Sequence, residues 1–391
     1  MRRYLIATAV ALSACSAVLA DTVGDVLKQI AANNLTLQSA AHDMRADVLD
    51  IKATNTLGGP SVEYSPFFTK GYSGVAESEL VVSQEIDFPT KYAARSKQAQ
   101  MQQTVGDRQL AKQRRDILLQ AQLVCIDVIR LNQSLAMLRE RLSNSEMLLQ
   151  MYEKRMEAGD ANALELNKVK IDCMEVRTLV GEAEGERTAL LQQLQQLNGS
   201  KPIDVSSTEL PHYEPIVDFE QYRALAVASD ADVAVAQTAL RAADMNLKVQ
   251  KSEWLPSISF GYRRNTEQRE AINGFMVGVS FPLYSNSSNV KAARERRQSA
   301  ELQVLQAQHD AEASLRTSYE QLQGLQQVID HSDVKLLQES LTLFRKALQQ
   351  GEITALAYYV EINSIYEKLQ RHIDLHSQSV KLLAELHKAE L

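Results

Sequence analysis

One stretch of this sequence occurs twice, and that repetition constrains the fold more than any other feature. The first copy, YEKRMEAGDANAL, spans Tyr152–Leu164, and the second, FRKALQQGEITAL, spans Phe344–Leu356. Each copy has a glycine followed by an acidic residue, and each lies between long helix-forming sequences. Glycine readily adopts the left-handed conformation that ends a helix. Each copy therefore predicts a tight turn between two long antiparallel helices.

Other short sequences repeat at a similar distance. The turn glycines, Gly159 and Gly351, are 192 residues apart, and the Phe-Pro pairs that end at Pro89 and Pro282 are 193 residues apart. An Ala-Ala-Arg triplet recurs after 199 residues. A spacing of about 190 residues indicates a tandem duplication and two similar halves of one structure. We expect the halves to be residues 21–198 and 218–391, with 199–217 as the linker.

The positions of the prolines indicate where long helices can form. None of the eight prolines lies between residues 90 and 201 or after residue 282. A proline inside a helix costs about 3 kcal/mol, so these two windows permit uninterrupted helix. The expected helices span 21–56, 90–158, a return helix to 197, 218–253, 288–350 and 354–391. One seam of the helix at 288–350 has the seven-residue period of a coiled coil: Leu315, Leu322, Ile329, Leu336 and Leu343.

The N-terminus has the pattern of an export signal. Arg2 and Arg3 precede an apolar stretch, and Val18-Leu19-Ala20 is a small-residue cleavage site, so residues 1–20 are expected to be a signal peptide. The alternative is a lipoprotein signal, Leu12–Cys15, with Cys15 lipidated. Both interpretations predict a protein that leaves the cytoplasm.

The charge, the hydrophobic pattern and the cysteines argue against a nucleic-acid partner, a membrane-spanning helix and a disulfide. The 42 basic residues include Arg2 and Arg3, so the chain after residue 20 has 40 basic and 49 acidic residues and a net charge of −9. This balance disfavours nucleic acid as a partner. No later run reaches the roughly 18 apolar residues of a membrane helix. Cys125 and Cys173 would lie roughly 30 Å apart in the hairpin, too far for a disulfide, so buried thiols are expected.

Each half also contains two candidate strands. The first pair spans 60–68 and 77–88, and the second spans 256–264 and 273–283, with connections at 69–76 and 265–272. Apolar and polar or small residues mostly alternate in these segments, the pattern of a strand between two different environments. Three aromatic residues lie at or near strand ends, as in the aromatic girdle of a membrane barrel: Trp254, Tyr262 and Tyr284.

These strands have the length and alternation of outer-membrane strands. A small soluble sheet that caps a helical bundle would show a similar pattern. Four strands cannot close a barrel, and an open edge cannot lie in lipid, so membrane strands would require several chains to share one barrel. Three chains would supply twelve strands. The expected fold is mainly α with a small β part: a hollow helical tube continuous with a shared β-barrel.

The signal peptide, the duplicated order of helix, strand pair, long helix, turn and helix, and the two glycine turns together resemble the outer-membrane factor family. These are the TolC-like exit ducts of tripartite efflux pumps and type I secretion systems, and the resemblance covers 21–391. It implies a homotrimer in the bacterial outer membrane, in contact with lipid, with a twelve-stranded β-barrel and a helical barrel in the periplasm.

The family also implies that the glycine turns contact a periplasmic adaptor, or membrane fusion, protein. Carried over onto this sequence, the contact residues are Ala158, Gly159, Asp160 and Ala161 in the first turn and Gln350, Gly351, Glu352 and Ile353 in the second. The alternative is that each turn serves only to reverse the chain.

Members of the family often narrow the periplasmic end with charged side chains just past the glycine. Glu165 stands at such a position after the first turn. At the matching position after the second turn the sequence has Ala357, and it has Ile353 where some members carry arginine; Glu361 is the nearest acid. Glu165 and Glu361 are therefore candidate gate residues, and ordinary solvated helix residues are the alternative.

His372 and His376, four residues apart on one helical face, have a spacing that can hold a metal. The residue after the first histidine is Ile373 rather than the glutamate of a metalloprotease motif, and we expect surface histidines. The sequence contains no phosphate loop, nucleophile elbow or paired-cysteine site. We therefore expect no enzymatic activity, no cofactor and no bound metal.

The expected function is a passive outer-membrane exit duct. In such systems an inner-membrane transporter, here expected to be of the resistance-nodulation-division type, supplies the energy and most of the substrate specificity. One alternative is a type I secretion duct for polypeptides in place of small molecules or metal ions. Another is a periplasmic coiled-coil structural protein without a pore.

Overall fold

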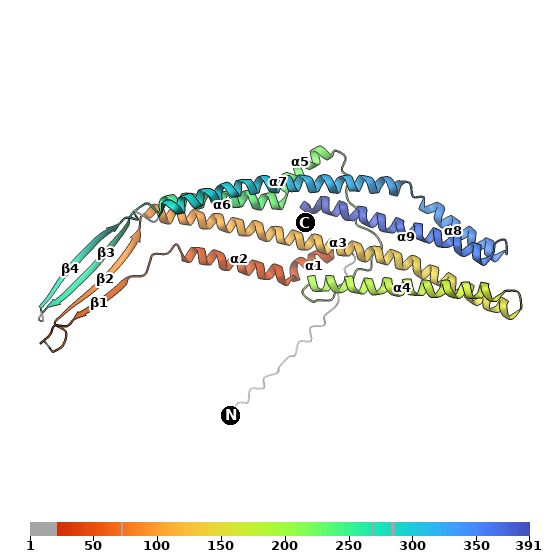
Figure 1. Cartoon of the computed structure of the whole chain (residues 1–391), viewed down its shortest axis with the longest axis horizontal. Coiled ribbons are helices and arrows are strands. Elements are labelled where there is room, and N and C mark those ends of the chain that lie inside the picture. Colours follow the sequence, from red (N-terminus) through yellow and green to blue (C-terminus); the bar gives the residue numbers. More distant parts are fainter. Residues whose placement is uncertain (1–21, 72, 268–269, 283–285) are drawn as a thin grey trace, which may run out of the picture. The chain divides into compact units, whose positions relative to one another are not determined.

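The computed structural model describes residues 22–71, 73–267, 270–282 and 286–391. The predicted signal peptide with Cys15 and the girdle residue Tyr284 lie outside these ranges. The chain is mainly helical with one four-stranded sheet, as the sequence predicts (Figure 1). Among the described residues, no helix is both long enough and apolar enough to span a membrane.

A similar order of elements occurs twice along the chain. The first series consists of α1 (Val23–Asn33), α2 (Leu35–Ala53), β1 (Ser61–Phe67), β2 (Glu77–Asp87), α3 (Pro89–Glu157) and α4 (Ala163–Leu197). The second consists of α5 (Phe219–Ser229), α6 (Ala231–Ser252), β3 (Ser257–Glu267), β4 (Glu270–Ser280), α7 (Ser287–Asp330), α8 (Val334–Gln349) and α9 (Ala355–Leu386), followed by a 3₁₀ turn, His387–Glu390. The second series has two helices, α7 and α8, where the first has α3. This order agrees with the expected duplication, which remains an inference from the sequence.

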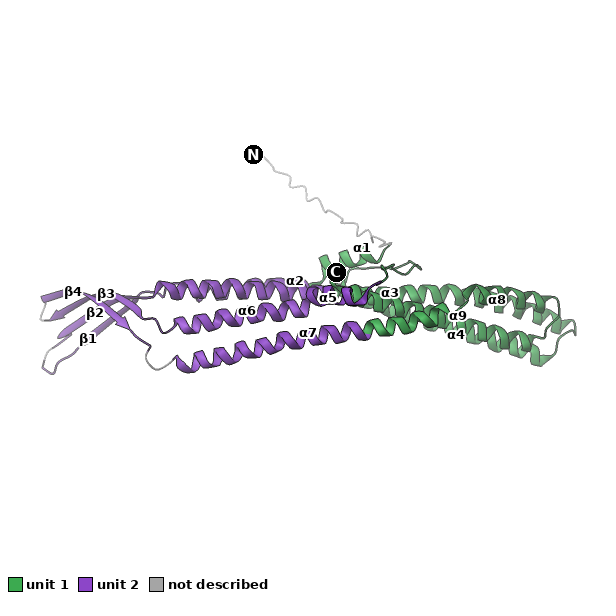
Figure 2. Ribbon diagram, turned by 90° about the horizontal axis from the view of Figure 1, so that it is seen from above, with its two compact units in different colours: residues 1–35, 116–215, 318–391 green, residues 36–115, 216–317 purple. Residues whose placement is uncertain are grey.

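The chain forms two compact units (Figure 2). Unit 1 comprises residues 1–35, 116–215 and 318–391, and unit 2 comprises residues 36–115 and 216–317. Each unit therefore contains segments from both predicted halves.

The long uninterrupted helix after the first strand pair is confirmed. The prediction placed 69 residues at 90–158, and α3 has 69 residues, Pro89–Glu157. Proline is well tolerated in the first turn of a helix, where its missing N–H has no helical partner.

Three other predicted helices are each divided into two, which corrects the prediction. The helix expected at 21–56 is interrupted at Asn34, the one at 218–253 at Asp230, and the one at 288–350 at 331–333. Asn34 and Asp230 have extended backbone conformations. The Asp230 carboxylate accepts hydrogen bonds from the Asp232 and Val233 backbone N–H groups of α6, and the Asp333 carboxylate accepts one from the Leu336 N–H of α8. Side chains of this kind favour a helix start over a helix interior.

The third interruption also affects the predicted coiled-coil seam. Leu315 and Leu322 on α7 are buried, whereas Leu336 and Leu343 on α8 are 58% and 65% exposed. A single chain thus buries only part of the seam.

The four strands form one antiparallel sheet in the order β1-β2-β3-β4. The first pair agrees with the predicted strands. In the second pair, β3 extends to Glu267 and β4 begins at Glu270, so the connection is shorter than the predicted 265–272. The predicted alternation is confirmed, because the apolar residues Ile258, Phe260 and Tyr262 of β3 pair directly with the apolar residues Val279, Val277 and Phe275 of β4.

The main core of unit 1 joins α1 to the middle of α3 and the end of α4. Val26 and Ile30 of α1 are fully buried there against Leu118, Ala121, Val124, Cys125, Val128, Ile129, Leu194, Ile203 and Val205. The ends of α1 and α4 also make direct polar contacts, since the Asn34 amide donates to the Leu197 carbonyl and the Asn33 amide donates to Asn198.

Gly199 allows this close approach. Its φ is +63°, and a Cβ atom added there would lie 2.4 Å from the Asn33 carbonyl oxygen, a backbone atom. We predict that Gly199→Ala lowers the stability of unit 1 by on the order of 2 kcal/mol, because it adds left-handed strain and a backbone clash. Thermal unfolding of the detergent-solubilised protein, followed by circular dichroism, measures this change.

Gly181→Ala is the matched control, because a Cβ at Gly181 in α4 meets nothing within 4 Å. It should leave stability unchanged or raise it by up to about 1 kcal/mol through helix propensity. Equal melting temperatures for the two variants would contradict the close approach at Gly199.

Candidate functional site

The two glycine turns of unit 1 have the same backbone geometry. Gly159 has a φ of +80° and Gly351 a φ of +75°. In the first turn the Asp160 N–H donates to the Arg155 carbonyl and the Gly159 N–H to the Met156 carbonyl. In the second turn the Glu352 N–H donates to Ala347 and the Gly351 N–H to Leu348. Both turns are thus Schellman motifs, which satisfy the last carbonyl groups of α3 and α8.

A helix N-cap follows each glycine within three residues. Asn162 begins α4 with a capping box, in which its side chain accepts from the Glu165 N–H and the Glu165 carboxylate accepts from the Asn162 N–H. The Thr354 hydroxyl accepts from the Ala357 N–H and begins α9. The short polar spacers therefore start the return helices, as the sequence predicts.

Both turns have exposed surfaces. Six of the eight predicted adaptor-contact residues are exposed, and Ala161 and Ile353 are half-buried. A Cβ atom added at Gly159 or Gly351 would meet no atom within 4 Å. The glycines are therefore required by the backbone conformation alone, and the space around them is open.

Ala161 and Ile353 pack against one hydrophobic core, which joins the α3–α4 hairpin to the α8–α9 hairpin. Burial raises the pKa of Tyr358 in this core to about 12. It also raises the pKa of Tyr359, and the Asp172 carboxylate adds to that increase. Both phenols therefore stay neutral. The buried residues of this core are Leu148, Tyr152, Val169, Leu348, Ala355, Tyr358, Tyr359, Ile362, Ile365, Tyr366 and Leu369.

A buried ion pair lies beside this core and was not foreseen from the sequence. Asp172 of α4 is 2% exposed, and it accepts hydrogen bonds from Arg141 of α3 at 3.0 Å and from the Ser145 hydroxyl at 2.6 Å. The same Arg141 nitrogen donates to Asn363 of α9 at 2.8 Å, and the guanidinium lies 5.0 Å from the centre of the Tyr366 ring. This network links three helices from both hairpins.

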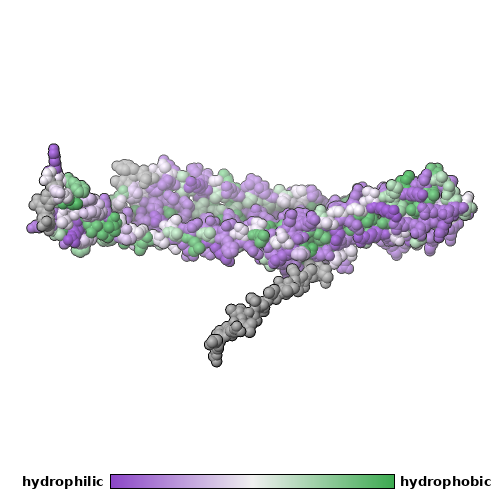
Figure 3. Space-filling view, turned by 90° about the horizontal axis from the view of Figure 1, so that it is seen from below, coloured by the Kyte–Doolittle hydropathy of each residue, from purple (hydrophilic) through white to green (hydrophobic). Residues whose placement is uncertain are grey.

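The sheet of unit 2 has one apolar and one polar face. Figure 3 shows hydrophobic residues (green) among hydrophilic ones at the surface of the strands, at the left of the view. Of the large residues on the apolar face, Phe275 is the most exposed, at 93%. On the polar face, Arg263 forms an ion pair with Glu79 at 2.7 Å, and the Ser61 and Ser83 hydroxyls lie 2.7 Å apart. Such an asymmetric sheet fits a boundary between lipid and water. The other exposed apolar side chains on this face are Val62, Tyr64, Phe260, Tyr262, Val277 and Val279.

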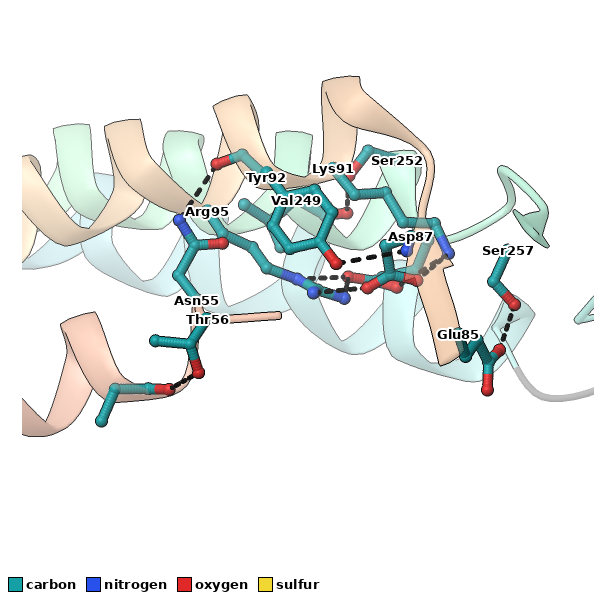
Figure 4. A network of polar contacts seen from close by, with 12 residues as sticks. Asn55, Thr56, Glu85, Asp87, Lys91, Tyr92, Arg95, Val249, Ser252 and Ser257 are labelled. Carbon is teal, nitrogen blue, oxygen red and sulfur yellow. Dashed lines mark hydrogen bonds and ion pairs between the residues drawn. The ribbon is translucent and has the colours of Figure 1, made fainter. Parts of the chain in front are cut away.

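A four-charge network joins the ends of these strands to the helices (Figure 4). Arg95 of α3 bonds Asp87 at the end of β2 and Glu253 at the end of α6, each at 2.7 Å. Lys91, only 4% exposed, lies within 3.5 Å of the same two carboxylates. Two cations and two anions therefore balance where β2 leads into α3 and α6 leads into β3.

Comparisons with known proteins agree with this geometry. The family model described as "Outer membrane efflux protein" matches residues 26–200 and 223–389. The chain belongs to this family.

Solved structures of similar fold extend over nearly the whole chain. CusC matches with a TM-score of 0.76 at 18% identity, over 95% of this chain and 93% of its own. VceC of Vibrio cholerae matches with a TM-score of 0.74 at 16% identity, over 94% of this chain and 95% of its own. The MtrE outer membrane channel of Neisseria gonorrhoeae matches with a TM-score of 0.72 at 14% identity, over 94% of this chain and 88% of its own. None of the curated proteins matches the chain.

Membership of the outer membrane efflux protein family confirms the resemblance seen in the sequence and the predicted location in the bacterial outer membrane.

The structure places the two candidate gate residues differently. Glu165 is half-buried and serves as the third residue of the α4 capping box, a structural role that the sequence pattern Asn-x-x-Glu could have revealed. Glu361 on α9 is exposed. Their role as a gate remains a proposal.

The two cysteines are both buried, whereas the two histidines of α9 differ in burial. Cys125 and Cys173 are both free and buried, as predicted, and burial raises the pKa of each thiol, to about 12 for Cys125. His376 is exposed, as expected for a surface histidine, whereas His372 is half-buried. Among the described residues, no group of three or more His, Cys, Asp or Glu side chains could hold a metal ion.

We predict that Asp172→Ala in this efflux-family protein lowers the stability of unit 1 by about 3–5 kcal/mol. The substitution would leave the Arg141 charge buried without its carboxylate partner. Denaturant or thermal unfolding of the detergent-solubilised variant measures this loss.

Glu184→Ala is the matched control. It removes the exposed ion pair between Arg139 and Glu184, which has a similar N–O distance of 2.7 Å, and it should cost less than about 1 kcal/mol. An Asp172 variant as stable as the Glu184 variant would show that the buried network does not hold the hairpins.

Proposed function

We propose that this protein is the outer-membrane exit duct of a tripartite efflux system. Its sheet carries the argument. β1 and β4 are edge strands, each paired on one side only, and one sheet face exposes large apolar side chains. In lipid, every unpaired backbone group costs several kcal/mol, so the edges must pair with other strands.

A homotrimer provides those strands. When β1 of one copy pairs with β4 of the next, three copies give a closed barrel of twelve strands, with the apolar face toward lipid and the polar face lining the pore. The exposed Leu336 and Leu343 on α8 support the same assembly, because neighbouring copies would cover the seam that one chain leaves open. The helices then form a periplasmic barrel continuous with the β-barrel.

The glycine turns are the adaptor contact in this proposal. The two turns share one backbone motif, and their surfaces are open to a periplasmic adaptor with helical hairpin tips. The capping residue Glu165 and the exposed Glu361 lie shortly after the turns, where a ring of carboxylates could form a gate. Dilation of these ends on docking would open the duct.

The duct conducts passively and needs no catalytic group or cofactor of its own. An inner-membrane transporter, of the resistance-nodulation-division type in this proposal, supplies the energy. A duct for secreted polypeptides would share these features, and a transport assay with small molecules and metal ions distinguishes the two functions. A non-pore coiled-coil protein would give no conductance in a planar bilayer.

We predict that Gly159→Trp or Gly351→Trp abolishes export while the trimer stays intact. A bulky side chain would block docking at the turn, whereas the folded protein would bear only the left-handed strain, about 1–2 kcal/mol. Export by cells that carry each variant, together with trimer content after detergent extraction, measures both effects.

Gly181→Trp is the control, because Gly181 also has open space but lies within α4. It should retain export. Full export by both turn variants would contradict the docking assignment without excluding the pore, which the bilayer conductance tests separately.

A further inference from the structure

The helix α9 carries two histidines that the proposed duct does not use. His372 and His376 lie four residues apart on one face, with ring centroids 6.1 Å apart and ring planes at 28°. The two rings lie side by side, and because both residues belong to one regular helix, the distance between their Cα atoms is fixed.

The two rings have different surroundings. His376 is exposed, whereas the Nδ1 atom of His372 is buried and has no hydrogen-bond partner among the described residues. His331 provides a contrast, because its Nδ1 atom lies 2.6 Å from the Gln327 carbonyl oxygen. A buried polar nitrogen without a partner is unfavourable, so a hydrogen-bond donor, an acceptor or a metal ion near His372 would stabilise the ring.

We propose that His372 and His376 together bind one divalent transition-metal ion of the class that prefers imidazole nitrogen. A ring nitrogen binds such an ion at about 2.0–2.1 Å, and it does so in the plane of the ring. The two nearly parallel rings must therefore rotate about their side-chain bonds to bring one nitrogen of each to a common ion. The pair uses the i, i+4 spacing by which two histidines on a helix hold a metal. The order of divalent affinities makes Cu²⁺ the tightest of the series and the most sensitive probe.

The site is open, which limits what it can do. The described residues supply no third His, Cys, Asp or Glu ligand, so water or a ligand carried by the ion completes the coordination. An open two-histidine site suits reversible capture of an ion, in contrast to the closed ligand sets of structural metal sites. This inference does not depend on the proposed adaptor contact or on the pore.

Electron paramagnetic resonance of the full-length protein in detergent, titrated with Cu²⁺ near pH 7, tests the proposal. We expect one saturable Cu²⁺ per chain with hyperfine structure from two imidazole nitrogens. His372→Ala and His376→Ala should each lose this two-nitrogen signal. His331→Ala and His309→Ala are the matched controls and should keep it.

His376→Ala keeps the test decisive if His372→Ala fails to fold, since His376 is exposed. An unchanged two-nitrogen spectrum in a folded His376→Ala protein would overturn the proposal. Loss of the signal in His331→Ala or His309→Ala would assign the ion to another site and would also overturn it. Bilayer conductance, measured without metal, reports separately on the duct.

Discussion

The unpaired backbone groups at the two edges of the sheet limit the environments in which this protein can fold. Among the described residues, β1 and β4 each have one side without a strand partner, and the sheet presents an apolar face that water does not favour. In water, exposed edges can be solvated, but in hydrocarbon they cannot. The chain belongs to a family of outer-membrane proteins, and in the proposed assembly other copies supply the missing strand partners.

Within each unit, ion pairs connect different helices and strands. In unit 2, Arg95 and Lys91 hold Asp87 and Glu253 together where strands lead into helices. In unit 1, Arg141 and Asp172 hold the two hairpins together beside a core rich in tyrosine. A buried ion pair adds little stability compared with apolar residues of the same size. Removing one of its partners nevertheless lowers the stability strongly, because the other charge stays buried and unpaired. Such pairs therefore favour one defined arrangement of helices.

Much of this structure could be predicted from local sequence signals. Gly159 and Gly351 were predictable because a left-handed turn is a property of a few residues, and α3 was predictable because no proline interrupts it. The helix interruptions at Asn34, Asp230 and Asp333 had local signals too, since these side chains favour helix ends. Long runs of helix-forming residues on both sides of these positions favour a continuous helix and obscure that signal.

The buried ion pair between Arg141 and Asp172 could not be predicted without the tertiary structure. Asp172 lies between Val169 and Val176 on an apolar face of α4, and an acid in that position was the available signal. Its partner Arg141 and the neighbouring Asn363 come from other helices, and nothing in the sequence alone pairs them. The same holds for His372, whose spacing from His376 is visible in the sequence but whose buried nitrogen is not.

Electron cryomicroscopy of the purified protein in a lipid nanodisc would show how the sheet edges are paired. We expect three copies around one axis, with β1 of each copy hydrogen-bonded to β4 of its neighbour in a closed twelve-stranded barrel within the bilayer. A single copy with open sheet edges, or an assembly whose strands lie outside the lipid, would contradict it.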